Sequence, residues 1–391
     1  CVSRPRRFGK SMAANMLTAY YSRGCDSRRL FQGLKIATHP DFEKHLNQYN
    51  VIHLNMQNFL SKTQTIEQMI ALVTKAVGRD LLRAYPDVDY LDKTILTFML
   101  DDIYQDCQVP FIFIIDEWDC IFRSRKNQLE EQTKYLDFLR DLLKDKSYIA
   151  LAYMTGILPI KKYGEHSAIN VFYEYSMTDA SPIEEFTGFT EQEVRQLCEQ
   201  YNMPFSETKK WYDGYCVDGV SIYNPKSVVE AMLRGKFSNY WTQTETYEAL
   251  KIYIQSNEFG VQDVILKLLA GEKEKIDTTT FSNDMVTFAT KDDVLTLLVH
   301  LGYLTYDAET KEIWIPNDEV MEQFISTVKV MGWGSVVTAL ETSEKLLQAT
   351  LSGDEETVAE LIEQAHQANA SILKYNDENA LSCVISLAYY S

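Results

Sequence analysis

Closely spaced cysteines and long apolar runs are both missing from this sequence. None of the seven cysteines forms a Cys-x-x-Cys pair, and the six histidines are equally scattered. This argues against a zinc site and for reduced, mostly buried thiols. No apolar run approaches the roughly 18 residues that span a bilayer, and no signal peptide is visible. We therefore expect a cytoplasmic protein with no membrane partner.

Basic residues are scarce relative to acidic ones. The formal net charge is −18 over 391 residues and the pI is about 4.8, which disfavours a surface that coats nucleic acid. Apolar residues make up 46% of the chain and aromatic residues 12%, so a sizeable core can form and a disordered chain is excluded. The length allows two or three domains.

The start of the chain is the exception to this acidity. Four cations fall within seven residues there: Arg4, Arg6, Arg7 and Lys10. They indicate a nearby anion or, in the alternative, a solvated basic turn. The stretch ends in Gly-Lys-Ser at 9–11, the end of a phosphate-binding loop. The usual glycine five positions earlier is replaced by Arg4, so the loop needs support from a second motif.

That second motif follows an apolar run at residues 111–115, which predicts a strand buried on both faces of a parallel sheet. The run leads into Asp-Glu-Trp-Asp at 116–119. Carboxylates at the carboxyl end of such a strand lie where ligands of open α/β sheets bind. The alternative for Asp116 and Glu117 is that they cap the following helix. Asp119 is equally suited to a helix N-cap and to a supporting role.

The rest of the chain predicts an α/β fold that becomes mostly helical. We expect further strands at 51–56, 148–154 and 170–175, and helices at 12–21, 66–84, 90–104 and 129–144. This alternation is typical of a mainly parallel sheet. Later helices are expected at 182–185, 190–201 with Thr190 as cap, 206–212 and 225–233, with a linker at 271–275.

Towards the end, a helix at 291–300 and paired strands at 303–306 and 312–315 resemble a winged-helix module. Its few basic residues favour packing over DNA binding. Two more helices are expected within 335–367, joined at 352–354.

The loop and the acidic strand end together predict nucleotide hydrolysis, which needs charge neutralisation and a positioned water. Lys10 would contact the β- and γ-phosphates, and Ser11 with Asp116 would hold Mg²⁺. Glu117 would polarise the attacking water as the second catalytic residue beside Lys10. Thr155, at a neighbouring strand end, could sense the γ-phosphate.

Other residues complete the expected nucleotide site. They flank the lysine in the sequence: Arg6, Arg7, Phe8, Gly9 and Met12. Arg123, Arg125 and Arg140 are candidates for an arginine finger across a subunit or domain boundary. For each of those three arginines a surface salt bridge is the favoured alternative.

Four motifs together resemble the bacterial AAA-ATPase-like family of P-loop NTPases. They are Ser-Arg-Pro-Arg-Arg-Phe-Gly-Lys-Ser at 3–11, the acidic tetrad at 116–119, Thr-Gly-Ile-Leu at 155–158, and Trp-Tyr-Asp-Gly-Tyr at 211–215 with Tyr-Asn-Pro at 223–225. They cover about residues 1–316 in the family's order, and this family's loop also has arginine in place of glycine at position 4. The resemblance implies ATP at the loop, Mg²⁺ near Asp116 and a catalytic Glu117. It also implies that 211–215 belong to a helical lid. Trp118 stands where the family usually has tyrosine.

That family commonly continues into a domain of the PD-(D/E)XK nuclease superfamily. Residues 375–379 resemble the opening of such a domain, with Glu378 as its first acid. We therefore expect a P-loop core over 1–180 whose first strand is nearly missing, a helical lid over 181–275, a winged-helix-like module over 276–334, and a helical segment with a truncated nuclease-like start over 335–391. The chain is interpreted as a fragment cut at both ends.

Two functions follow from these observations. The first is an ATP-binding, slowly hydrolysing switch that is coupled to a nuclease-like domain, through which nucleic acid could be a partner; an oligomer is compatible with it. The alternative is a nucleotide-binding module without turnover that positions a partner or nuclease. Direct DNA binding by this chain is least favoured because of its charge of −18.

We predict that the purified chain has no nuclease activity. In the family that it resembles, the Asp and the Glu-x-Lys that bind metal lie beyond the stretch matched by residues 375–379. Incubation with DNA and with RNA in the presence of Mg²⁺, followed by electrophoresis, should leave both substrates intact. Metal-dependent cleavage would refute the prediction.

Overall fold

The computed structural model describes residues 1–125, 128–159, 172–241, 260–269, 271–281, 288–330 and 334–369. The chain forms two compact units, one of Cys1–Phe237 with Lys275–Ile313 and one of Ser238–Glu274 with Trp314–Ser391. The expected nuclease-like opening at 375–379, including Glu378, lies outside the described residues. The four segment boundaries expected from the sequence stay a prediction.

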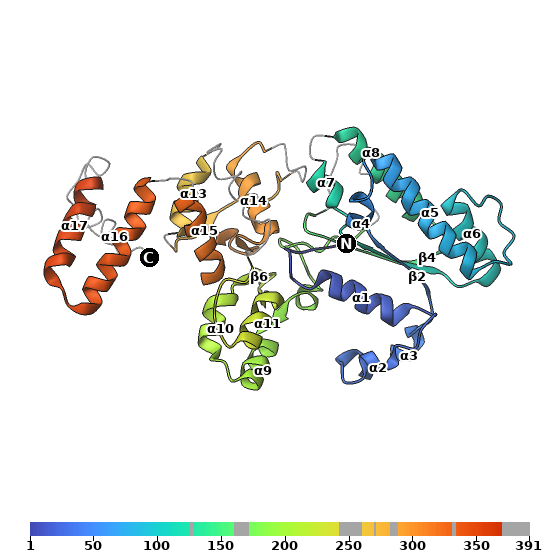
Figure 1. Cartoon of the computed structure of the whole chain (residues 1–391), viewed down its shortest axis with the longest axis horizontal. Helices are drawn as coiled ribbons and strands as arrows, with labels where there is room; N and C mark the ends of the chain where they lie inside the picture. Colours follow the sequence, from blue (N-terminus) through green and yellow to red (C-terminus); the bar gives the residue numbers. More distant parts are fainter. Residues whose placement is uncertain are drawn as a thin grey trace. The chain divides into compact units, whose positions relative to one another are not determined.

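A four-stranded parallel sheet forms the centre of the first unit (Figure 1). Its order is β1-β4-β3-β2, with β1 at Val2–Ser3, β2 at Asn50–Asn55, β3 at Phe111–Asp116 and β4 at Ile149–Gly156. The strands predicted at 51–56, 111–115 and 148–154 are confirmed to within two residues. The strand before the phosphate loop is only two residues long, but it pairs in register with the end of β4, Val2 with Thr155 and Ser3 with Gly156.

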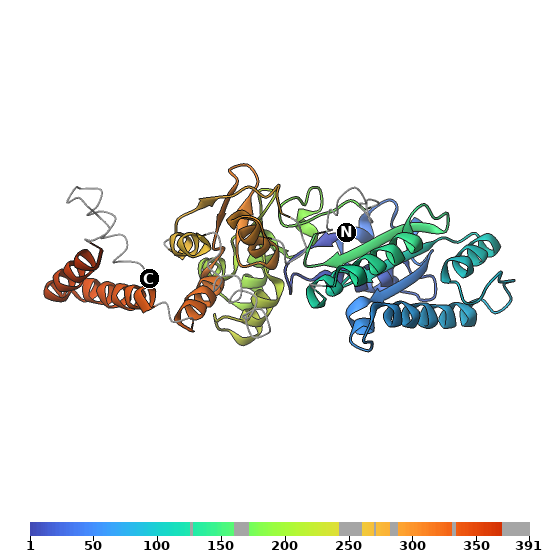
Figure 2. The same ribbon diagram turned by 90° about the horizontal axis from the view of Figure 1, so that it is seen from above.

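Helices cover both faces of this sheet (Figures 1 and 2). On one face α1 (Lys10–Tyr21) packs through Ala14 against Ile112 and Ile114. On the other face the alternate residues of β3 pack with α5 (Ile66–Ala84), α6 (Leu96–Cys107) and α8 (Leu129–Leu143). Every residue of β3 is buried, as the continuous apolar run predicts for a central parallel strand. Short helical segments complete this half: α2 (Arg28–Phe31), η1 (Lys35–Thr38), α3 (Phe42–His45), α4 (Met56–Leu60) and α7 (Cys120–Ser124).

The helix predicted over 90–104 begins later than expected, at Leu96. The Asp92 carboxylate accepts hydrogen bonds from the N–H of Thr94 (2.7 Å) and from its hydroxyl (2.6 Å). Such a local side-chain turn competes with the helical backbone. In addition, Asp102 of the helix accepts the N–H of Leu91 at 2.9 Å, which keeps the preceding segment folded back on α6.

The first unit also contains a small antiparallel sheet in the order β5-β7-β6. In chain order, this region comprises η2 (Glu184–Phe186), β5 (Phe189–Thr190), α9 (Glu191–Tyr201), α10 (Phe205–Tyr212), β6 (Tyr215–Val217), β7 (Val220–Tyr223) and α11 (Pro225–Arg234). Thr190 caps α9 in a capping box with Glu193, as predicted. The helix expected at 182–185 is only the 3₁₀ turn η2.

The predicted helix and strand pair near residue 300 are confirmed as α14 (Lys291–Leu301), β9 (Thr305–Asp307) and β10 (Glu312–Trp314). The linker expected at 271–275 is wrong at its end, because β8 (Glu274–Lys275) joins these strands in the order β8-β10-β9. The adjoining Ile276 is buried and donates its N–H to the Lys311 carbonyl at 3.0 Å. The end of the stretch that was expected to be a linker thus lies in a sheet. The winged-helix resemblance stays a prediction.

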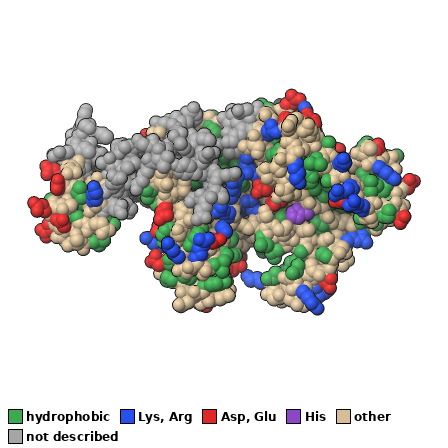
Figure 3. All heavy atoms as spheres, viewed as in Figure 1, with side chains coloured by type: hydrophobic (Ala, Val, Ile, Leu, Met, Phe, Trp, Pro, Cys, Tyr) green, Lys and Arg blue, Asp and Glu red, His purple; other side chains and the backbone are tan. Residues whose placement is uncertain are grey.

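The second unit is mainly helical in the part that is described. It contains α13 (Val261–Leu269), α15 (Asp318–Val330), α16 (Gly334–Ser352) and α17 (Glu355–Asn369), and the turn between the last two lies where it was predicted. Acidic side chains gather over α17 in Figure 3 and include the exposed Glu355, Glu356, Glu360 and Glu363. Across the part of the chain that the structure describes, no helix has the length and apolar character needed to cross a membrane.

We predict that Gly156→Ala destabilises the first unit. A Cβ at position 156 would lie 2.6 Å from Nε1 and 2.8 Å from Cδ1 of the fully buried Trp118, and overpacking of this kind costs about 1–3 kcal/mol. Denaturant unfolding should detect the loss. Gly24→Ala is the matched control because nothing lies within 4 Å of its added Cβ. Equal stability of the two variants would contradict this account of the strand end.

Candidate functional site

The phosphate loop connects β1 to α1. Gly9 is the N-cap of α1, with φ at +86° and open space where a Cβ would stand. Arg7 also has a left-handed backbone, with φ at +70°, a conformation that non-glycine residues rarely adopt. The two turns place the N-terminus of α1, with its partial positive charge, at the carboxyl edge of the sheet, where anions bind favourably.

Lys10 is held by its own loop. Its Nζ donates hydrogen bonds to the carbonyl oxygens of Arg4 (2.8 Å) and Pro5 (2.7 Å), and the residue is 6% exposed. Burial lowers the pKa of the Lys10 ammonium to about 8, although the nearby Glu117 and Asp119 carboxylates act in the opposite direction. The ammonium has three N–H donors, so one is left for a phosphate oxygen, and a second phosphate contact would require it to give up a loop carbonyl.

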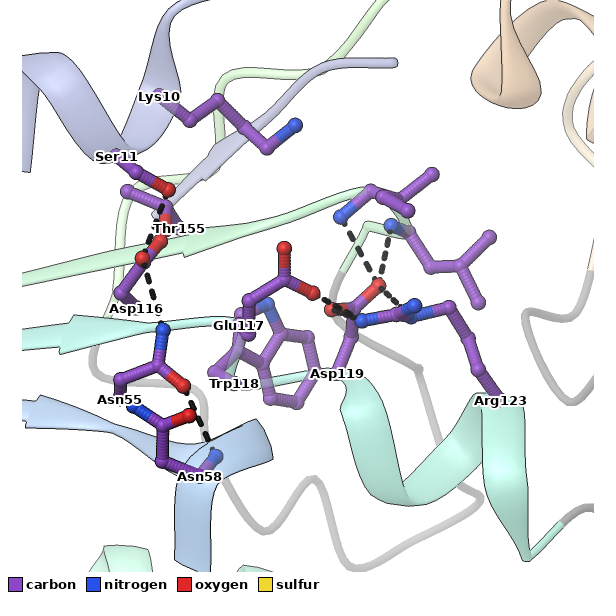
Figure 4. A network of polar contacts seen from close by, with 12 residues as sticks. Lys10, Ser11, Asn55, Asn58, Asp116, Glu117, Trp118, Asp119, Arg123 and Thr155 are labelled. Atoms are coloured by element: carbon purple, nitrogen blue, oxygen red, sulfur yellow. Dashed lines mark hydrogen bonds and ion pairs between the residues drawn. The ribbon is translucent and has the colours of Figure 1, made fainter. Parts of the chain in front are cut away.

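Asp116, at the end of β3, accepts hydrogen bonds from three different elements (Figure 4). Ser11 Oγ at the start of α1 donates to Oδ2 at 2.8 Å, and Asn55 Nδ2 at the end of β2 donates to the same oxygen at 3.2 Å. Thr155 Oγ1, near the end of β4, donates to Oδ1. Asp116 is 4% exposed. The carboxylate thus ties the loop to the ends of three neighbouring elements, and it does not cap a helix.

Glu117 turns away from the strand with a left-handed backbone, φ +57°. Its Oε2 forms an ion pair with Arg123 Nη2, and its side chain is 28% exposed. Figure 4 shows its carboxylate directed to Arg123. Asp119 behind it is fully buried, and Arg123 Nε lies 3.3 Å from its Oδ2. The acidic tetrad therefore divides into one carboxylate bound to the loop and two that share an arginine.

Asp119 also fixes the segment that follows β4. Its Oδ2 accepts the backbone N–H groups of Ile157 and Leu158, both at 2.9 Å. Asp119 stands at the N-cap position of α7 but makes no capping hydrogen bond to that helix. Between the two roles left open by the sequence, the structure favours the supporting one.

The four cations at the start of the chain were expected to lie beside an anion or in solvent, and this is wrong for Arg4. It is completely buried, and its Nη1 donates to the carbonyl oxygens of Ser3, Tyr175 and Ser176 at 2.8–3.1 Å. Burial lowers the pKa of Arg4 to about 10. The residue in the usual glycine position thus braces the loop from inside and holds the chain near residue 175 beside β1.

The other loop residues differ in their exposure. The Phe8 ring is fully buried and packs edge-on against Tyr215, with 5.0 Å between ring centroids, so only its backbone can face a phosphate. Met12 is 65% exposed, and Arg6 and Arg7 are partly buried. Their roles in nucleotide binding stay a prediction, as does the role of Thr155 as a sensor.

The three candidate finger arginines separate clearly. Arg140 makes the expected surface ion pair with Asp137 at 2.7 Å, and Arg125 donates to the Gln64 carbonyl at 2.5 Å. Arg123 is different because it binds the acids of the site itself.

Asn55 was missed in the sequence, although a polar residue at the end of the strand at 51–56 was a usable signal, since parallel strands end at one edge.

The oxygen donors at this edge fit Mg²⁺. Ser11 Oγ and Asp116 Oδ2 already lie 2.8 Å apart, and Mg²⁺ commonly takes one or two protein oxygens together with water and phosphate oxygens. Among the described residues no group of three or more His, Cys, Asp or Glu side chains could hold a metal. A magnesium ion here would therefore depend on nucleotide oxygens for much of its coordination.

Comparison with known proteins identifies a family for the part of the chain that forms this sheet edge. The family model described as "Predicted AAA-ATPase" matches residues 1–164. Residues 1–164 belong to the AAA-ATPase-like family. The match includes the loop, the acidic tetrad and Thr155, so this part of the chain has the α/β fold of the P-loop proteins.

A curated relative from Azotobacter chroococcum mcd 1, "Uncharacterized protein in vnfD 5'region", is 23% identical over 252 residues. The alignment covers 63% of this chain and 47% of that protein. The chain thus spans about half the length of the curated relative that it matches.

Similar solved structures include three archaeal proteins. They are the Aeropyrum pernix ORC2 protein in ADPNP–ADP complexes (13% identity, TM-score 0.34, covering 84% of this chain and 86% of that one), Cdc6p from Pyrobaculum aerophilum (9%, 0.24, 84% and 86%), and the Aeropyrum pernix ORC1 protein in complex with DNA (10%, 0.27, 83% and 85%).

We predict that nucleotide affinity falls as the pH rises above 8. Because burial lowers the pKa of Lys10 to about 8, the ammonium loses its proton above this pH and the phosphates lose a cationic partner. The affinity for nucleotide should fall by up to about tenfold per pH unit. Binding should then take up protons, which calorimetry detects in buffers of different ionisation enthalpy. Lys10→Arg, whose charge does not titrate, should remove the pH dependence. A constant wild-type affinity between about pH 7 and about pH 9.5 would contradict the prediction.

Proposed function

We propose that this chain binds ATP with Mg²⁺ and hydrolyses it slowly, acting as a nucleotide-dependent switch. The observation that carries the proposal is the convergence of Lys10, Ser11, Asp116 and Glu117 at one sheet edge. These residues lie in the stretch that matches the AAA-ATPase-like family.

Each of these residues would have its own role in binding or hydrolysis. Ser11 Oγ and Asp116 would hold Mg²⁺, which neutralises phosphate charge when bound. Lys10 would transfer its ammonium from the loop carbonyls to the β- and γ-phosphates. Glu117, which is partly exposed and stands beside Asp116, would accept a proton from the attacking water. Gly9 and the first N–H groups of α1 would bind the phosphates through the backbone.

One observation favours the alternative of binding without turnover. The Glu117 carboxylate is already engaged by Arg123, and an acid held in an ion pair is a weaker base than a free one. In that alternative the chain would hold ATP at the same loop, and it would position a partner without consuming the nucleotide.

The wider role remains part of the proposal. Coupling to a nuclease-like domain, and nucleic acid as its partner, rest on the sequence resemblance alone. The helical lid over 181–275 rests on the same resemblance, whereas a cytoplasmic location rests on the cysteine pattern and the lack of a long apolar run in the sequence, and an oligomer is only compatible with the proposed switch. The exposed acids of α17 support the view that this helix itself does not bind a phosphate backbone.

We predict that Glu117→Gln retains ATP binding and loses turnover. Glutamine keeps the size of the side chain but cannot accept the proton, so kcat should fall about 100-fold or more. Lys10→Ala should instead weaken ATP binding, because it removes the phosphate cation. Phosphate release and a binding titration with ATP and Mg²⁺ measure the two effects.

Glu130→Gln serves as the control, since this exposed glutamate pairs only with Lys134 at the described surface. It should match the wild type in both assays. Equal, background-level turnover in wild type and Glu117→Gln would end the hydrolysis proposal. If ATP still bound and Lys10→Ala abolished that binding, the module without turnover would replace it.

A further inference from the structure

Arg123 forms an ion pair with Glu117. It is not among the residues proposed to bind the phosphates or the metal. We infer that Arg123 is a positioning residue, which fixes the Glu117 carboxylate for the attacking water. The inference rests on the proposed hydrolysis, and it gives the arginine a role within its own chain instead of a finger role across a boundary.

The first support for this role is that Arg123 is itself anchored from behind. Its Nε lies 3.3 Å from Asp119 Oδ2, and its Nη2 donates to Oδ1 at 3.4 Å. Asp119 is fully buried and is fixed by two backbone N–H groups from the segment after β4. The ion pair with this buried carboxylate restrains the guanidinium that also pairs with Glu117.

The backbone beneath the arginine is equally constrained. Arg123 lies in the short helix α7, one turn after Asp119, and its neighbours Cys120, Ile121 and Phe122 are at most 2% exposed. Burial of the Arg123 side chain acts to lower its pKa, but Asp119 and Glu117 outweigh burial and the net pKa is raised. The arginine is therefore charged at neutral pH.

The geometry at Glu117 leaves one oxygen for chemistry. Oε2 pairs with Arg123, while no hydrogen bond from the described residues reaches Oε1. The left-handed backbone of Glu117 is rotated away from the strand. Together these two restraints, one at the backbone and one at Oε2, determine where Oε1 points.

The same ion pair also opposes catalysis to some degree, because a cation stabilises the carboxylate and makes it a weaker base. Orientation should outweigh this effect, since misplacing a reacting group by 1 Å can cost about 100-fold in rate. The competing effects predict opposite changes in kcat when the arginine is removed, so the rate distinguishes them.

The test uses Arg123→Ala and Arg123→Lys, with Arg140→Ala as the matched arginine control at the surface. We expect Arg123→Ala to lower kcat for ATP by about 10- to 100-fold, with KM and the Kd for ATP unchanged. Arg123→Lys keeps the charge but not the two-pronged geometry, and should recover part of kcat. Arg140→Ala should match the wild type.

Unchanged or faster turnover in Arg123→Ala would overturn the inference while the proposed hydrolysis stood. Loss of ATP binding in both Arg123 variants would also overturn it, because that result indicates a purely structural role. If Arg123→Ala does not fold, Arg123→Lys decides: a reduced kcat with unchanged Kd supports positioning, and a wild-type kcat contradicts it. If the wild type itself does not hydrolyse ATP, the proposed function fails and the inference fails with it.

Discussion

The buried carboxylate of Asp116 is the interaction on which the site depends. A buried charge is costly unless hydrogen bonds compensate it, and here the donors come from α1, β2 and β4 through Ser11, Asn55 and Thr155. None of these donors is adjacent to Asp116 in the sequence. The carboxylate can therefore accept all three hydrogen bonds only when the strands pair in this register. The same requirement brings the phosphate loop against the acidic strand end. The hydrogen bonds that join the strand ends therefore also hold the site together.

Much of this arrangement could be predicted because its signals are local. The apolar run before Asp116 specifies a central strand, and the positions of Lys10 and Ser11 after Gly9 specify a loop and helix. Since the carboxyl ends of parallel strands share one edge, Thr155 could be placed near the acids as well. The family match over residues 1–164 agrees with this expectation.

What could not be predicted depends on contacts between distant residues. In the sequence Arg4 looks like a cation beside an anion or in a solvated turn, and only the chain near Tyr175 explains its burial, because those carbonyls accept its hydrogen bonds. Arg123 likewise looks like one of several helix arginines. Its distinction comes from Asp119, whose own orientation is fixed by Ile157 and Leu158. Periodicity in the sequence carries no information about such pairings.

The aromatic residue of the loop shows how a switch in this fold would have to work. Phe8 precedes Gly9 directly, yet its ring is buried against Tyr215 of β6, whose hydroxyl donates to the Gly302 carbonyl at 3.0 Å. An aromatic contact of this kind contributes about 0.5–1.5 kcal/mol beyond burial. Any nucleotide-dependent movement of the loop must therefore either carry the β5-β7-β6 sheet and the end of α14 with it or break this contact. Phe8 therefore links the loop that carries Lys10 to the β5-β7-β6 sheet.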